Sequence, residues 1–407
     1  MQLWQRGVRL SAPVGAPFSE FSAPARVTLP LQWGETPLVR VGERVGLGQK
    51  IADGAGETVP LHASVSGTVA AIAPKVCADG KRWTAVVIDS DGEERPAPGL
   101  TGRPLADGLS GEELFALLCE AGIREPDGRP LSALVEEAAG GCRTLICSAI
   151  DQEPFTLSED AALTAAPERV LGGLRLLLRL FRPETAVLAV SAAQKEALRA
   201  VTRWIPKGDS LRLAVMPDRY PMGDARRLAE LIASVRPGES LASRGTAVVR
   251  ASSAAAMEAA VYDGMPVVRQ TVSVNWLTGQ KIFSVPLGTP VAEVLRACGR
   301  DETEAVLGGP MMGRRLRCWN VPVTKGMSGF TLLSGEQKAA PAGPCIRCGR
   351  CAEVCPAELR PYLAARRRGG AAWSVCLRCG ACEYACPAGR PLMEEILRLG
   401  REAANVG

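Results

Sequence analysis

The sequence predicts a multidomain protein of the α/β plus β class, and three observations carry this prediction. Its 407 residues are enough for roughly two to four domains at the usual domain size. The apolar pattern changes from strand-like to alternating strand and helix after about residue 105. Eight of the 14 cysteines fall between Cys345 and Cys386, so the C-terminus is a separate kind of segment.

Residues 1–105 predict a small β domain. Val39–Asp53 and Val59–Ile72 alternate apolar with polar residues and carry glycine where tight turns are needed. His62 lies in the second of these segments and is the one histidine of the chain. We expect it to be a structural residue of the β domain.

Residues 106–265 alternate short apolar runs with amphipathic stretches. The runs 143–150, 185–190 and 246–252 read as strands, and the stretches between them have helical periodicity. Strands separated by helices in this way indicate βαβ units. We therefore predict an α/β domain with a parallel or mixed sheet.

Residues 266–335 predict a smaller α+β module. Two strand-like runs are followed by a helix, for which Thr289 is the expected N-cap and Pro290 the first helical residue. A linker rich in alanine, glycine and proline leads into residues 336–407, which hold the clustered cysteines and a helical tail.

Composition excludes several classes of function. A hydrophobic content of 47% excludes a mainly disordered chain, and a single histidine excludes sites built on several histidines. The net charge of +5 gives no support for nucleic-acid binding. Signal-peptide and transmembrane patterns are missing from the sequence, so we expect a cytoplasmic protein with no transmembrane segment of its own. Clustered cysteines in that compartment indicate a metal or redox site.

Two cysteine runs repeat one spacing near the C-terminus. Both read C-x2-C-x2-C-x3-C-P, the bacterial two-cluster ferredoxin pattern, in which the fourth cysteine of each run ligates the other cluster. We expect that fourth cysteine to open a helix that points away from its own loop. The predicted ligands are Cys345, Cys348, Cys351 and Cys386 for cluster 1, and Cys376, Cys379, Cys382 and Cys355 for cluster 2.

Zinc is the alternative occupant of such a segment. A zinc site needs four ligands, usually as two separated CxxC pairs, which does not explain three cysteines at every third position occurring twice. The other cysteines fit no ligand spacing, and we expect them to be small buried apolar side chains. They are Cys77, Cys119, Cys142, Cys147, Cys298 and Cys318.

Several segments together resemble the RnfC family of electron transport complex subunits. Val39–Asp53 followed by Pro60–Ile72 is similar to the family's N-terminal barrel-sandwich domain, and the paired cysteine runs close the resemblance. LGGPMMG, together with those runs, is its specific part. The intervening matches, in family order, are Gln152–Asp160, Arg219–Asp224, Pro286–Gly299, Leu307–Gly313 and Pro322–Gly329.

The resemblance implies four modules and a redox role. They are a barrel-sandwich hybrid (1–105), an α/β domain like the flavin/NADH-binding domain of the 51-kDa subunit of respiratory complex I (106–265), an SLBB-type β-grasp module (266–335) and a two-cluster ferredoxin domain (336–407). In the family, electrons pass from NADH through FMN to the clusters and on to membrane partners. The resemblance therefore implies redox partner proteins, including membrane-embedded Rnf subunits, and a peripheral place on the inner face of the cell membrane.

The flavin loop of the family is altered here. The family has a glycine-rich loop whose backbone N–H groups approach the cofactor, whereas Ala121–Ser132 keeps only Gly122 and Gly128. Glu125 and Asp127 in the same segment would repel phosphate. Further on, an asparagine-valine-glycine-threonine stretch of the family reads VVRASSAAAM.

Glu153, Tyr220 and Gly223 are the remaining candidate contacts for FMN or NADH, since they match the family's acidic and tyrosine-proline motifs. Two alternatives follow. In the first, the α/β domain binds FMN through altered contacts and the protein oxidises NADH. In the second, which the lost glycines favour, the domain keeps the fold without that chemistry, and Glu153 and Tyr220 hold the structure together.

The predicted function is electron transfer. Two [4Fe–4S] clusters would relay single electrons between a donor and a partner oxidoreductase, a step that needs no catalytic acid or base. One alternative is an FMN-containing, NADH-dependent reductase subunit. Another is an assembly or structural subunit whose clusters have no redox role.

Overall fold

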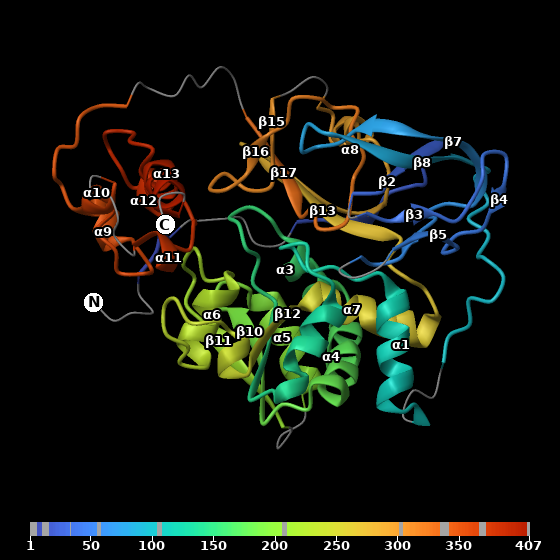
Figure 1. Cartoon of the computed structure of the whole chain (residues 1–407), viewed down its shortest axis with the longest axis horizontal. Coiled ribbons are helices and arrows are strands. Elements are labelled where there is room, and N and C mark those ends of the chain that lie inside the picture. The colour runs from blue at the N-terminus through green and yellow to red at the C-terminus, as the bar shows by residue number, and fades with distance from the viewer. Residues whose placement is uncertain are drawn as a thin grey trace.

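The computed structural model of the chain places its elements in two groups of strands, an α/β domain and a cluster of short helices. In Figure 1 the strands β2 to β8 and β13 to β17 lie above the α/β domain, and the helices α9 to α13 lie beside it. None of the described helices combines the length and apolarity that crossing a membrane requires. The structure describes residues 6–9, 16–32, 34–54, 58–103, 108–205, 210–300, 304–333, 342–365 and 372–404.

Two small antiparallel sheets build the first β domain. One has the strand order β2-β8-β7-β4 and the other β3-β5-β6. The alternation seen in the sequence turns Val45, Ile51 and Val69 inward, where they join one apolar core between the sheets. The strands are β2 (Arg26–Pro30), β3 (Thr36–Pro37), β4 (Arg44–Val45), β5 (Lys50–Asp53), β6 (Leu61–His62), β7 (Gly67–Val76) and β8 (Arg82–Ser90).

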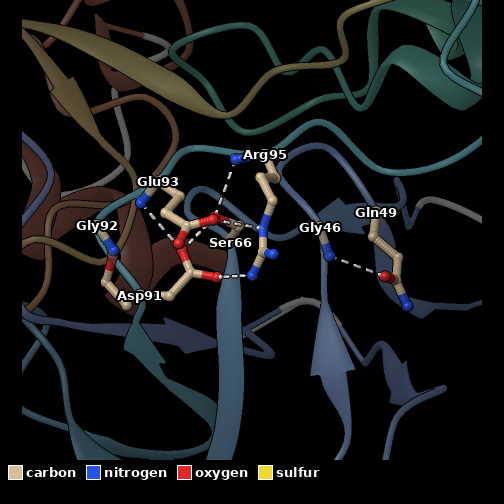
Figure 2. A network of polar contacts seen from close by, with 8 residues as sticks. Gly46, Gln49, Ser66, Asp91, Gly92, Glu93 and Arg95 are labelled. Carbon is tan, nitrogen blue, oxygen red and sulfur yellow. Dashed lines mark hydrogen bonds and ion pairs between the residues drawn. The ribbon is translucent and has the colours of Figure 1, made fainter.

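A polar network closes the turn after β8 (Figure 2). Ser66 Oγ donates to Asp91 Oδ1 at 2.6 Å, and Arg95 Nη2 donates to Asp91 Oδ2 at 2.6 Å. The hydrogen bonds from Ser66 and Arg95 lower the pKa of Asp91 to about 2. Nearby, the Gly46 N–H donates to Gln49 Oε1 at 3.0 Å. The Asp91 carboxylate is thus used to hold this turn.

The second domain has a wholly parallel sheet of order β11-β10-β9-β12, covered by helices. Helix α1 begins at a capping box between Ser110 and Glu113 and ends at Gly122, whose φ is +69°. Its elements are α1 (Gly111–Ala121), α2 (Leu131–Glu137), β9 (Thr144–Ser148), α3 (Ser158–Ala165), α4 (Pro167–Phe181), β10 (Thr185–Ser191), α5 (Lys195–Trp204), β11 (Leu211–Met216), α6 (Ala225–Ile232), β12 (Thr246–Arg250) and α7 (Ala251–Glu258).

The third domain is a six-stranded mixed sheet of order β1-β14-β13-β17-β15-β16. Strand β1 (Phe18–Glu20) pairs in parallel with β14, so the start of the chain joins a sheet formed mostly after residue 268. The N-cap of α8 is Pro290, because Thr289 Oγ1 donates instead to the Pro286 carbonyl at 2.7 Å, and the expected cap at Thr289 is wrong by one residue. The remaining elements are β13 (Arg269–Trp276), β14 (Gly279–Pro286), α8 (Val291–Arg296), β15 (Ala305–Leu307), β16 (Arg314–Arg315) and β17 (Gly329–Leu332).

The C-terminal segment consists of short helices around the cysteine loops. The two helices that follow the loops, α9 and α12, have four residues each. Helix α13 is the longest of the group and packs against α10, α11 and α12. The bounds are α9 (Arg350–Glu353), α10 (Pro361–Ala364), α11 (Ala372–Val375), α12 (Ala381–Tyr384) and α13 (Leu392–Ala404).

Candidate iron–sulfur site

The two cysteine loops repeat one backbone conformation. Arg347 and Arg378, each just before the second cysteine of its run, have φ of +59° and +57°. Gly349 and Gly380, each just after that cysteine, have φ of +81° and +70°. Left-handed residues alternating with ordinary ones turn successive backbone N–H groups toward one side, which makes an anion-binding concavity of the kind found at iron–sulfur sites. Each loop is therefore shaped to surround a negatively charged group.

The third and fourth cysteines of each run lie on either side of the end of a helical turn. Cys351 is within α9 and Cys382 within α12, whereas Cys355 and Cys386 come after those helices. The expectation that the fourth cysteine opens a helix is therefore wrong. Each helix begins directly after a left-handed glycine, and one turn of about 3.6 residues is complete before the fourth cysteine is reached.

Cys386 lies with the first three cysteines of the other run. Cys345, Cys348, Cys351 and Cys386 line one small cavity, and Arg390, which also lines it, hydrogen-bonds to Cys345. Burial raises the pKa of Cys351, and the neighbouring Cys386 and Cys348 thiols raise it further. We call these four cysteines the outer set.

Cys355, in turn, lies with the three leading cysteines of the second run. Burial raises the pKa of Cys382 above its usual range, and the adjacent Cys379, Cys355 and Cys376 raise it further. Cys355 and Cys379 are only 7% and 9% exposed, whereas Cys348 of the outer set is exposed. We call Cys355, Cys376, Cys379 and Cys382 the inner set.

The donor chemistry of both sets fits a thiolate-ligated cluster. Each set offers four thiols, the ligand number of a [4Fe–4S] cluster. The Arg378 N–H already donates to Cys376 Sγ at 3.4 Å, the kind of amide-to-sulfur contact that tunes such clusters. Across the described ranges, no group of three or more His, Cys, Asp or Glu side chains is arranged to hold a single metal ion.

Tyr220 joins the α/β domain to the inner set. Its hydroxyl donates to the Cys379 carbonyl at 2.6 Å, and its ring packs with Leu377 and Ala381. Burial raises the pKa of Tyr220 far above its usual value, so the phenol remains a hydrogen-bond donor at all working pH values. The tyrosine of the flavin-type motif therefore supports a cysteine loop.

Tyr220→Phe is expected to loosen this contact. Removing the hydroxyl leaves the buried Cys379 carbonyl without its donor, at a cost of about 1–2 kcal/mol in the free energy of unfolding. Thermal unfolding of the cluster-loaded protein, followed by the visible absorbance of the clusters, measures the loss. Tyr384→Phe is the matched control, because Tyr384 is 60% exposed. Equal unfolding temperatures for the two variants would contradict the assignment.

Glu153 binds the loop that carries the LGGPMMG motif. Its Oε2 and Oε1 accept hydrogen bonds from the N–H groups of Met311 at 3.2 Å and Met312 at 2.5 Å. The Met311 carbonyl reaches the inner set, since a Cβ on Gly380 would lie 2.7 Å from its oxygen. Burial raises the pKa of Glu153 to about 7, against the opposing effect of the two N–H donors. Glu153 thus helps to position three domains.

The raised pKa of Glu153 predicts a pH-dependent contribution to stability. The folded protein binds this proton more tightly than the unfolded chain, whose pKa is near 4.5. Its contribution is therefore complete below about pH 4.5 and is lost as the pH rises through about 7. Glu153→Gln cannot ionise, so its unfolding temperature should fall less than that of the natural protein between about pH 5.5 and 8. Glu136→Gln, at an exposed site, should keep the natural profile, and an unchanged profile for Glu153→Gln would refute this role.

Gly223 completes the three candidate flavin contacts. Its carbonyl accepts a hydrogen bond from Arg250 Nη1 at 2.9 Å, and a Cβ on Gly223 would lie 2.1 Å from the Asp151 carbonyl oxygen. Glu153 and Tyr220 are likewise engaged in contacts within the chain. The structure brings these three residues near one another around the ends of β9 and β11, but their polar groups do not fit a role as flavin ligands.

Arg227 and Arg6 are contacts that the sequence reasoning missed. Arg227 is 1% exposed, pairs with Glu230 at 3.0 Å and donates to the Pro356 carbonyl at 3.3 Å, directly after the inner cysteine Cys355. Arg6 donates to the Ala352 carbonyl at 3.2 Å. Two adjacent arginines occur in α6, and no sequence pattern distinguishes the buried one from its neighbour.

The other singled-out residues serve the fold. His62 is 4% exposed, and burial with the nearby charges of Lys325 and Lys50 lowers its pKa to about 3. Among the six cysteines outside the runs, Cys77, Cys142 and Cys147 are buried, and Cys119 and Cys298 are half-buried. Cys318 is exposed, against expectation, because it lies in the irregular segment between β16 and β17.

Three parts of the chain match known domain families. Residues 11–93 match the RnfC barrel sandwich hybrid domain, residues 120–258 the Nuo51 FMN-binding domain and residues 340–387 a 4Fe-4S dicluster domain. These matches confirm the resemblance for three of the four predicted modules. They also assign a 4Fe-4S domain type to the segment that contains both cysteine sets.

Curated relatives extend the similarity along most of the chain. An RnfC-type subunit of the ion-translocating oxidoreductase complex from Serratia proteamaculans is 31% identical over 371 residues, which is 85% of this chain and 52% of the relative. The protein of the same name from Pectobacterium atrosepticum is 31% identical over 366 residues, with the same coverage. The chain spans about half the length of these relatives. A solved NAD+-reducing [NiFe]-hydrogenase in its H2-reduced state aligns with 74% of this chain and 55% of its own, at 16% identity and a TM-score of 0.46.

Proposed function

We propose, given that this chain is an RnfC-like relative of ion-translocating oxidoreductase complex subunits, that it relays single electrons through two [4Fe–4S] clusters to a partner oxidoreductase. One observation carries the proposal: the fourth cysteine of each run lies with the three leading cysteines of the other. That exchange is the ligand arrangement of two-cluster ferredoxins.

The outer and inner sets are the proposed ligands. Cluster 1 would be held by Cys345, Cys348, Cys351 and Cys386, and cluster 2 by Cys355, Cys376, Cys379 and Cys382. When bound, these clusters supply one-electron transfer. The chain's own residues position them: Tyr220 fixes the Cys379 carbonyl, and Arg390 hydrogen-bonds to Cys345.

The two sets differ in their access to solvent, and this difference supports a direction for the relay. The inner set is covered by Tyr220 and Leu377, whereas Cys348 of the outer set is exposed beside Ile346, which is 65% exposed. Electron transfer between proteins requires close approach of the partner. We therefore propose that a redox partner docks over the outer set.

The relatives' name supports further proposals about partners and place. Subunits of an ion-translocating complex work with other subunits, so we propose redox partner proteins that include membrane-embedded Rnf-type subunits. The protein would then lie on the cytoplasmic side of the membrane as a peripheral subunit. We propose residues 266–335 as an SLBB-type β-grasp module, next to modules at 1–105, 106–265 and 336–407.

Anaerobic purification with metal analysis tests the electron-transfer proposal. We expect about eight irons and eight sulfides per chain, no zinc, and a visible absorbance that bleaches with dithionite. Zinc without sulfide would overturn the cluster assignment. Clusters that neither dithionite nor a partner can reduce would instead support the assembly or structural subunit.

The match of residues 120–258 to an FMN-binding domain favours one second candidate, an FMN-containing, NADH-dependent reductase subunit. It differs from the relay in a single measurable property, the flavin content of the purified protein. The internal contacts of Glu153, Tyr220 and Gly223 speak against it.

A further inference from the structure

The sheet of the α/β domain locates the place where a ligand of this fold would bind. From β9 the chain passes outward to β10 and β11, and β12 then lies on the other side of β9. The point at which the strand order reverses is therefore between β9 and β12. In open α/β sheets, ligands bind in the crevice outside the carboxyl ends of the strands at this point. Here those ends are Ser148 and Arg250.

The side chain of Arg250 lies across this crevice. Its Nη1 donates to Ser148 Oγ at 3.3 Å, to the Ile150 carbonyl at 3.2 Å and to the Gly223 carbonyl at 2.9 Å. Arg250 is 3% exposed and Ser148 is fully buried. One guanidinium thus joins the end of β12, the end of β9 and the loop after β11.

The helices that follow β9 and β12 have their first N–H groups occupied as well. Asp151 accepts from the N–H groups of Glu159 at 3.1 Å and Asp160 at 3.2 Å, at the start of α3. Glu159 accepts from the Ser252 N–H at 2.9 Å and its hydroxyl at 2.7 Å, at the start of α7. Helix N-termini at such positions bind phosphate through free N–H groups. In this chain, internal carboxylates take those positions.

Glu125 adds a third internal carboxylate. It comes from the segment that stands in place of the glycine-rich loop, and its Oε1 accepts from the Arg250 N–H at 3.3 Å. Glu125 is 4% exposed; burial raises its pKa to about 7, while the charge of Arg250 acts in the opposite direction. The altered loop therefore contributes a partner for the arginine.

We infer that Arg250, with Glu125 and Glu159 around it, closes the ligand crevice of the α/β domain, so that this domain binds no flavin mononucleotide. The domain then retains the fold of an FMN-binding domain with its phosphate positions filled by its own side chains. The inference is independent of the cluster ligands, because none of these residues belongs to either cysteine set.

Titration of the cluster-loaded protein with FMN tests the closure. We expect no flavin released by acid from the purified protein, and no saturable quenching of FMN fluorescence at FMN concentrations well above that of the protein. Iron measured on the same sample shows whether the clusters are loaded, so a failed cluster assignment is distinguished from a failed closure. One tightly bound FMN per chain would overturn the inference.

Paired substitutions test whether Arg250 and Glu125 act together. Arg250→Met should lower the unfolding temperature more than Arg129→Met, an exposed arginine in surface pairs with Asp127 and Glu137. Adding Glu125→Gln to Arg250→Met should lower it by less than the sum of the single effects, because both changes remove the same contact. Additive losses, or equal losses for the two arginine variants, would refute the closure.

Discussion

Replacing Cys351 and Cys355 together by alanine is expected to abolish both [4Fe–4S] clusters, although the two residues belong to one run. Cys351 lies in the outer set and Cys355 in the inner set, so each substitution removes a ligand from a different cluster. Replacing Cys351 and Cys386 together should leave one cluster intact, because both belong to the outer set. Iron should fall from about eight per chain to near zero in the first variant and to about four in the second.

The single variants supply the control for this comparison. Cys351→Ala and Cys355→Ala should each leave about four irons and one set of reduced-cluster EPR signals. Cys142→Ala, at a buried cysteine outside the runs, should keep all the iron. If Cys351 with Cys355 leaves one cluster while Cys351 with Cys386 leaves none, each run ligates its own cluster and the proposed exchange is wrong.

Gly380→Ala is expected to destabilise the inner cluster far more than Gly349→Ala destabilises the outer one. Both glycines follow the second cysteine of their run and have positive φ, so alanine costs about 1–2 kcal/mol at either position. At Gly380 the added Cβ would also lie 2.7 Å from the Met311 carbonyl oxygen. At Gly349 no atom lies within 4 Å of the added Cβ. We expect the close contact to add about 1–3 kcal/mol.

The rate at which each cluster is lost on warming measures this difference. EPR of the reduced protein follows the two clusters separately, and the signal missing from Cys355→Ala identifies the inner one. Gly380→Ala should lose that signal first, and Gly349→Ala should stay close to the natural protein. Equal losses would mean that the third domain does not support the inner loop through Met311.

The parts of this protein that were predictable are those encoded by neighbouring residues. Cysteine spacing fixes the two loops, because three ligands and a left-handed glycine lie within one short segment. The βαβ pattern of 106–265 follows from periodicity, because each helix buries one face against its own sheet. The start of α8 was missed by one residue, since the Thr289 hydroxyl has a competing acceptor in the Pro286 carbonyl.

Contacts between distant segments were not predictable in the same way. Arg250 in VVRASSAAAM was visible only as the loss of a polar stretch, because its acceptors come from separate segments at Ser148, Ile150 and Gly223. Tyr220 and Cys379 are far apart in sequence, and no local pattern links a tyrosine of a flavin-type motif to a cysteine loop. These contacts arise from the docking of whole domains.

The N-terminal strand β1 limits how this chain can be divided. It forms one edge of the third domain's sheet through Phe18–Glu20, while the first two domains lie between it and its partner β14 in sequence. A fragment that starts at residue 266 would lack this strand and expose the backbone donors and acceptors of β14. Unpaired edges of this kind associate with other chains. Fragments of the C-terminal half should therefore self-associate unless residues 16–21 are supplied as a peptide or fused ahead of β13.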